Sequence, residues 1–372
     1  MASKRLLQEV RNTMISEAIR TRQPVHVDPA VWHDEGPMPV SPASDLDAIA
    51  IDLANLQALY EQYKNTWRIG FANGQTVLTA KDLSVIASFR RTATAIDQRL
   101  QIWADSQAPH FSPLRMAMIE VPESVRKAGM YGNFCNVYPS AQLAGIWHAY
   151  NSYRLILLKM TLSADQTVRE MHRENDVFFA ESDKWRETAE ETLQHCVDEI
   201  CAVVPFHLGN RTGTGSILEF SDTTNLEYPW PKPENDPYSS PSTPTARDYA
   251  RRHNVVPLSS DERKRQNIAM GGYNILGPIA FVLGLAEEPL DLTGLRSTAP
   301  KLGSLLRPDQ IPWLAGQLQR TLKLHRTRRL DGDARKVSTP VQRRSSEQES
   351  KDGNLMKKVA AVKKTMEYSF GV

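Results

Sequence analysis

The sequence is poor in cysteine and has no long apolar run, and each absence excludes a class of protein. Only three of the 372 residues are cysteines, which is too few for the disulfide framework of a small secreted protein and fits a reducing compartment. The longest apolar stretch, ILGPIAFVLGLA at 275–286, is shorter than the roughly 20 residues that span a bilayer. The first twenty residues carry scattered charges and no apolar core, so we expect no signal peptide. We therefore expect a soluble protein of the cytosol or nucleus.

An excess of one charge is also lacking. Lysine and arginine number 45 against 43 aspartate and glutamate, so the net charge of +2 gives no overall field toward nucleic acid or an anionic membrane. We recognise no nucleotide-binding glycine loop, no His-Glu-x-x-His metal motif and no convergent pair of carboxylates. We therefore predict that the chain is not an enzyme and holds no cofactor or metal. A helical-bundle enzyme or small-molecule-binding protein is the alternative.

Helical periodicity is what the sequence does have. Apolar residues recur at alternating steps of three and four in several long windows, which is the period of a helix with one buried face. We predict an all-α fold, a large and irregular multi-helix bundle. Helices are expected over 46–67, 83–103, 141–162, 183–204, 261–285 and 309–325. The helix over 141–162 is apolar on nearly all sides, so we place it at the centre of the bundle.

The expected helices have predicted ends and predicted buried faces. Ser44 or Asp45 would cap the first helix, because either side chain can accept from a free backbone amide. Pro205 would end the fourth, because proline lacks an amide and restricts the residue before it. The inward-facing positions are Leu46, Ile49, Leu53, Leu56, Tyr60, Tyr63 and Trp67; Ile86, Phe89, Ala93, Ile96, Leu100 and Trp103; Trp185, Ala189, Leu193, Cys196, Ile200 and Val203; and Ile311, Leu314, Leu318 and Leu322.

Two segments lack the helical pattern. Six prolines fall in the sixteen residues from Pro229 to Pro244, and we predict that 210–257 is a long, disordered Pro/Ser-rich insertion. We predict that 326–372 is a basic, mostly disordered tail, which leaves 1–325 as the helical domain. Residues 320–344 contain nine lysines and arginines against two aspartates. Nuclear import or nucleic-acid contact is one interpretation of this segment, and a solvated tail is the other, with equal weight.

Cysteine and histidine gather in one stretch, HCVDEICAVVPFHLG at 195–209. Cys196 and Cys201 are five residues apart, so on a helix they point about 140° away from each other and do not converge on a metal. His207 lies beyond Pro205. A free cysteine on an apolar face has a raised pKa and behaves as a small hydrophobic residue, unlike an activated nucleophile. We predict that both cysteines are structural and buried.

Four segments resemble one family. YNSYRLILL at 150–158 is similar to a central helix in which an aromatic-Asn pair precedes an arginine and an aliphatic run, although Tyr150 stands where tryptophan is usual. ICAVVPFHLG at 200–209 and GGYNILGPIAFVLGL at 271–285 follow in the expected order, and RPDQIPWLAGQLQRTL is similar to the closing helix. Over about residues 1–325 the chain resembles the C-terminal regulatory region of fungal zinc binuclear cluster transcription factors.

That resemblance implies a nuclear, transcription-regulator-like protein that acts through an all-helical interaction domain. Members of the family read DNA through an N-terminal cluster of six cysteines holding two zinc ions, which this sequence lacks. Either the chain works without its own DNA reader, or an upstream exon is missing from the gene model. We expect no sequence-specific DNA binding. Transcription machinery or homologous regulators are the expected partners, a homodimer is left open, and a link to a fungal secondary-metabolite gene cluster is implied by resemblance only.

Aromatic residues on the expected central helix are the one candidate for a ligand site. Trp147, Tyr150 and Tyr153 recur at helical spacing and could line an effector pocket. The competing interpretation is ordinary core packing, which we favour at this stage. We propose no other catalytic, cofactor-binding or metal-binding residue from the sequence.

Overall fold

The computed structural model of the chain describes residues 2–26, 42–75, 77–108, 111–120, 130–138, 141–171, 176–208, 274–291 and 299–333. Its elements are α1 (Ala2–Thr21), α3 (Pro42–Ala72), α4 (Ala80–Asp105), β1 (Leu114–Ala117), β2 (Phe134–Val137), α6 (Ala141–Met171), α7 (Asp176–Leu208), a helix over 274–286, the short 3-10 helix Leu302–Leu305, and α10 (Gln310–Asp333). The described chain is mostly helical, which confirms the all-α prediction. The expected insertion over 210–257 and the part of the expected tail from 334 onward lie outside the described residues.

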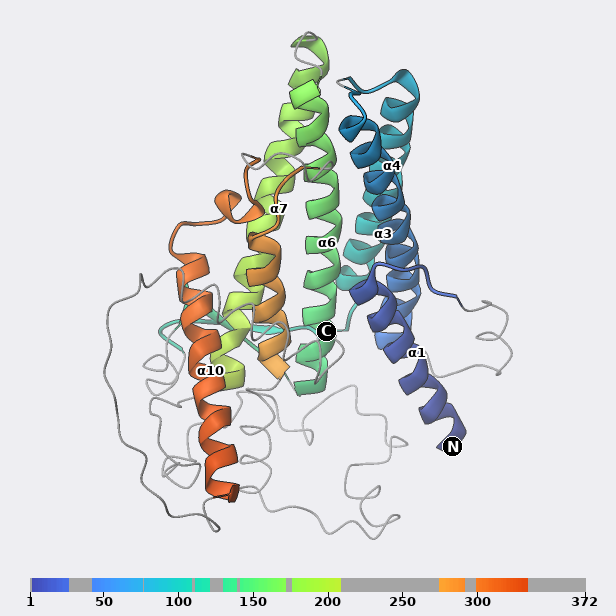
Figure 1. Cartoon of the computed structure of the whole chain (residues 1–372). Coiled ribbons are helices and arrows are strands. Elements are labelled where there is room, and N and C mark those ends of the chain that lie inside the picture. Colours follow the sequence, from blue (N-terminus) through green and yellow to red (C-terminus); the bar gives the residue numbers. More distant parts are fainter. Residues whose placement is uncertain are drawn as a thin grey trace.

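Helix α6 runs through the middle of the bundle, as its apolar sequence predicts. Figure 1 shows α1, α3 and α4 on one side of α6, and α7, the 274–286 helix and α10 on the other. Buried residues form one large core with α3 and α4 and a second with α7, the 274–286 helix and α10. Helix α6 contributes to both: Leu157 and Met160 belong to the first, and Leu158 and Leu162 to the second.

The predicted inward faces hold along most of their length. All six expected positions of α4 are buried, and so are six of the seven expected in α3, with Tyr63 half-buried. In α7 only Trp185 is less than fully buried, and in α10 Leu314 and Leu318 are buried while Ile311 and Leu322 are half-buried. Each pattern therefore identified a buried face, and the members that are not buried are half-buried rather than exposed.

The predicted helix ends were wrong in three places. Helix α3 begins at Pro42, before the expected caps Ser44 and Asp45, because proline is well suited to the first helical position. Helix α7 continues through Pro205 to Leu208. Proline removes a backbone hydrogen bond there, but Val204 and Leu208 are fully buried, and their packing outweighs that loss. Helix α10 extends past the expected limit at 325 to Asp333.

A small antiparallel sheet connects α4 to α6, and no pattern in the sequence predicted it. Strands β1 and β2 pair with Leu114 opposite Val137 and Ala117 opposite Phe134. The Asn136 side chain of β2 donates to Glu199 of α7 over 2.6 Å, which fastens the sheet to the end of that helix. Among the helices that the structure describes, every one is too short or too polar to cross a membrane.

Candidate functional site

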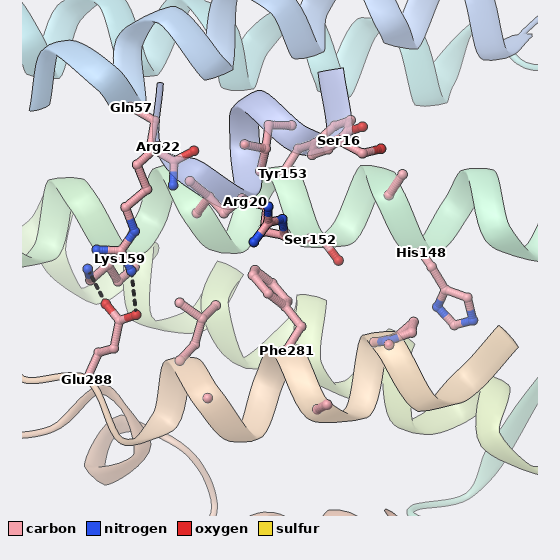
Figure 2. Close-up of a pocket in the computed structure, with 18 of the residues that line it drawn as sticks. Ser16, Arg20, Arg22, Gln57, His148, Ser152, Tyr153, Lys159, Phe281 and Glu288 are labelled. Atoms are coloured by element: carbon pink, nitrogen blue, oxygen red, sulfur yellow. Dashed lines mark hydrogen bonds and ion pairs between the residues drawn. The ribbon is translucent and has the colours of Figure 1, made fainter. Parts of the chain in front are cut away.

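A cavity of about 570 Å³ lies between α1, α3, α6 and the 274–286 helix. Figure 2 shows these four segments around it, with charged side chains at one end, His148 at the other, and Phe281 and Tyr153 between them. Cavities of this volume, mostly apolar and with a few polar groups, are the usual binding sites for small molecules. The cavity is therefore the candidate site.

The 274–286 helix lines the cavity with a small–large–small face. Gly277, Phe281 and Gly284 follow one another at helical spacings of four and three, and all three line the cavity. A Cβ atom built on either glycine would meet no other atom within 4 Å. Close packing therefore does not require these glycines, although each weakens the helix by about 1 kcal/mol relative to alanine. Their missing side chains leave the space that forms the cavity.

The charged end is a chain of ion pairs. Its side chains come from α3, from α6, from the residues just after α1 and from the residues just after the 274–286 helix. Glu288 accepts from Arg22 over 2.9 Å and also contacts the Lys159 ammonium group. Arg22 reaches Glu61 of α3 over 2.8 Å, and Lys64 lies 3.9 Å from the same carboxylate. Three cations therefore share two carboxylates, and of these five side chains Lys159 is buried while the others are half-buried.

The pKa values of this chain of ion pairs shift unequally. Burial alone would raise the pKa of Glu288, but Lys159 and Arg22 outweigh it and hold that pKa below its usual value. Burial lowers the pKa of Lys159, and Glu288 offsets this only in part. The two directions differ because Glu288 has two cationic neighbours, whereas Lys159 has one carboxylate and a side chain only 6% exposed. Lys159 is thus the less well compensated charge.

The backbone of Arg22 adopts a conformation that glycine normally supplies. Its φ is 57°, in the left-handed region, and the amide of Gln23 donates to the carbonyl of Ala18 over 3.0 Å. This geometry is a helix C-terminal turn in which the left-handed position usually has no side chain. An arginine here is strained by about 1 kcal/mol, and it directs its guanidinium into the ion pairs. Such strain is found most often at functional positions.

His148, which lines the other end of the cavity, is in contact with a second histidine, His207. His148 of α6 and His207 of α7 are buried, and their Nε2 atoms lie 3.1 Å apart. Burial lowers the pKa of His148 to about 4, and burial together with the neighbouring imidazole also lowers the pKa of His207 well below its usual value. Both rings are therefore neutral at pH 7, and one donates its Nε2 proton to the other. Nδ1 of His207 is buried and has no hydrogen-bond partner.

The three aromatic residues predicted for an effector site do not lie in one place. Tyr153 lines the cavity, but Trp147 and Tyr150 lie outside it. Both pack against Trp103 of α4, with ring centroids 5.2 and 5.5 Å away, and the Trp147 indole donates to the Phe111 carbonyl over 2.8 Å. The helical spacing grouped residues that the structure divides between cavity lining and core packing.

The two cysteines of α7 are fully buried, as predicted. Burial raises the pKa of Cys196 to about 12, so its thiol stays protonated, and it raises that of Cys201 too. The Gln310 amide of α10 donates to the Cys201 sulfur over 3.6 Å. Within the described ranges, no group of three or more His, Cys, Asp or Glu side chains could hold a metal ion.

Sequence reasoning missed the polar groups of the cavity. Lys159 gave one available signal, because it is a lone charge in the apolar run LILLKMTL of the central helix. Its partner Glu288 and the pairing of His148 with His207 depend on contacts between distant segments, which helical periodicity cannot predict. A comparison of the chain with protein-family models, curated proteins and solved structures finds no match.

Proposed function

We propose that this chain is a transcription-regulator-like helical domain that binds a small-molecule effector in the cavity between α1, α3, α6 and the 274–286 helix. The observation that carries the proposal is the face formed by Gly277, Phe281 and Gly284, which keeps space open where alanine would give a more stable helix. Natural cores normally fill such space, because each lost contact lowers stability. A cavity kept open at this cost favours a ligand.

The position of the cavity suits a regulatory role. Its lining comes from four segments, spread from Ser16 in α1 to Glu288 after the 274–286 helix. A ligand touching all four would favour the arrangement that binds it best, and so shift the balance between conformations of the whole domain. An enzyme has less support, because the charged groups that line the cavity are each in ion pairs and the imidazole of His148 contacts His207.

The transcriptional part of the proposal rests on the sequence resemblance. It includes nuclear location, contact with transcription machinery or homologous regulators, and a role in a secondary-metabolite gene cluster. A reporter assay tests it: the chain is fused to an unrelated DNA-binding domain and expressed with the reporter in fungal cells. We expect reporter output to differ from that of the DNA-binding domain alone, and equal output would contradict the transcriptional role.

The ligand-binding part is tested by filling the cavity. Gly284→Leu places a side chain in the open space, whereas Gly316→Leu makes the same change at an exposed position of α10. Thermal shift with a library of small amphipathic molecules should identify ligands that stabilise the wild type and Gly316→Leu but leave Gly284→Leu unchanged. Stabilisation of all three proteins alike would place binding elsewhere and refute this site.

A further inference from the structure

Charge is distributed unevenly along the cavity. Figure 2 shows Lys159, Arg22 and Glu288 together at one end, while the opposite end has His148, which is neutral at pH 7. Between the ends the lining is largely apolar, with Ile156 of α6 and Phe281 among its residues. A molecule that fits this lining has a charged or strongly polar head at one end and an apolar body.

The contacts of Lys159 indicate the sign of that head. Its ammonium group has three hydrogens, but among the described residues its only ionic partner is one oxygen of Glu288. The ring of Tyr60, whose centroid lies 5.9 Å away, is its other neighbour of note. Glu288 is shared with Arg22, so neither cation has a carboxylate to itself. Lys159 can therefore donate a hydrogen bond to a second anionic oxygen.

The local charge balance points the same way. The chain of ion pairs joins Lys159, Arg22 and Lys64 through Glu288 and Glu61, so cations exceed carboxylates by one. Arg20 adds a further cation to the lining, and Figure 2 draws it among the side chains around the cavity. Glu17 pairs with Arg20 from an exposed position on α1. Because buried charges are stable only when they are paired, a bound anion would balance this end.

We propose that the effector of this cavity is a monoanionic amphipath, with one carboxylate head held by Lys159 and Arg22 and an apolar body lying along Phe281 and Ile156. This inference rests on the proposed ligand-binding function and specifies the class of ligand. The head would compete with Glu288 for the same two cations. Removing the Glu288 carboxylate should therefore raise the affinity for the ligand.

Two opposite substitutions test the head-group assignment. We would measure binding of dodecanoic acid, dodecanol and dodecylamine to the full chain by displacement of a fluorescent probe, at concentrations below micelle formation. The wild type should bind the acid at least about tenfold more tightly than the alcohol, the ratio expected for a charge-assisted hydrogen bond. Lys159→Met should lower that preference, because Arg22 alone is left to hold the head, and Glu288→Gln should increase it. A purely structural role for the ion pair would make both variants weaker binders.

The control is Lys301→Met. Lys301 pairs with Glu287, the neighbour of Glu288, but does not line the cavity, so the same change there should leave the preference intact. Equal binding of acid and alcohol, or tighter binding of the amine, would overturn the anionic head and leave the proposed function standing. If none of the three amphipaths displaces the probe, the proposed function itself is refuted. If Glu288→Gln fails to fold by circular dichroism, the Lys159→Met result decides: an unchanged preference for the acid over the alcohol overturns the proposal.

Discussion

At one end of the cavity Lys159 and Glu288 remain charged and are paired, whereas at the other end His148 stays neutral and is joined to the neutral His207 by one hydrogen bond. At both ends polar groups are removed from water, which costs free energy. Ion pairing offsets this cost at one end, and neutral side chains reduce it at the other. Pairing of opposite charges holds over a wide pH range and fails when one partner is removed. A neutral histidine should be destabilised less when its partner is removed. It stays neutral, however, only while the pH is above the range in which imidazoles gain a proton.

The largest effect of a single substitution should come from breaking the pair at the charged end. Glu288→Gln leaves Lys159 buried without a carboxylate and should lower the free energy of unfolding by about 3 kcal/mol. Lys159→Met should lower it by no more than about 1 kcal/mol, because Arg22 still pairs with Glu288 and methionine keeps the apolar stem. Urea unfolding measures both. Equal losses would show that the two charges are equally well compensated, against the asymmetry described above.

Acid should affect the two ends in separate windows. The pKa of His148 is about 4 in the folded chain and near 6.5 in the unfolded one, so the unfolded chain takes up the proton first as pH falls. Stability should be complete above pH 6.5 and decrease toward pH 4 by roughly 1.4 kcal/mol per pH unit for each histidine. The pKa of Glu288 is lowered, so its contribution is present above the usual carboxyl pKa and is lost only at more acid pH.

Replacing both imidazoles separates these windows. The double variant His148→Leu, His207→Leu should remove the decrease between pH 6.5 and 4 and leave the more acid transition in place. Lys159→Met combined with Glu288→Gln should do the reverse. Unfolding curves recorded from pH 7 to 3 measure both. A decrease that persists without the histidines would assign it to other groups.

A smaller effect isolates the strain at Arg22. Both Arg22→Ala and Arg22→Gly lose the ion pairs with Glu61 and Glu288, but only glycine adopts the left-handed backbone without strain. The glycine variant should therefore be the more stable of the two by about 1 kcal/mol. Thermal or urea unfolding of the two variants gives the difference. An alanine variant of equal stability would mean that the turn relaxes when the arginine is lost.

Local patterns predicted the helices well and their ends poorly. The face of α4 from Ile86 to Trp103 was predicted completely, because burial on one side of a helix imposes a period on the sequence. Helix α7 continues past Pro205 because buried apolar contacts with other helices outweigh a local preference. Rules based on neighbouring residues cannot predict those contacts between helices.

The cavity was harder to predict, for the same reason. Of the three predicted aromatics only Tyr153 lines it, since the same spacing serves cavity lining and core packing. Arg22 and Glu288 are 266 residues apart, and only the assembled bundle brings them together. Glycines such as Gly284 look like ordinary weak points of a helix until the space beside them is seen.

The central position of helix α6 affects how the domain unfolds. Its residues belong to both large cores, so neither core can come apart without removing one wall of the other. The bundle should therefore behave as one cooperative unit, with no stable half-folded state in which only α3 and α4 or only α7 and α10 are detached. Backbone amides in the middle of α6, around Leu157 and Leu158, should then exchange with solvent hydrogen only through global unfolding, more slowly than those of α1 or the end of α10.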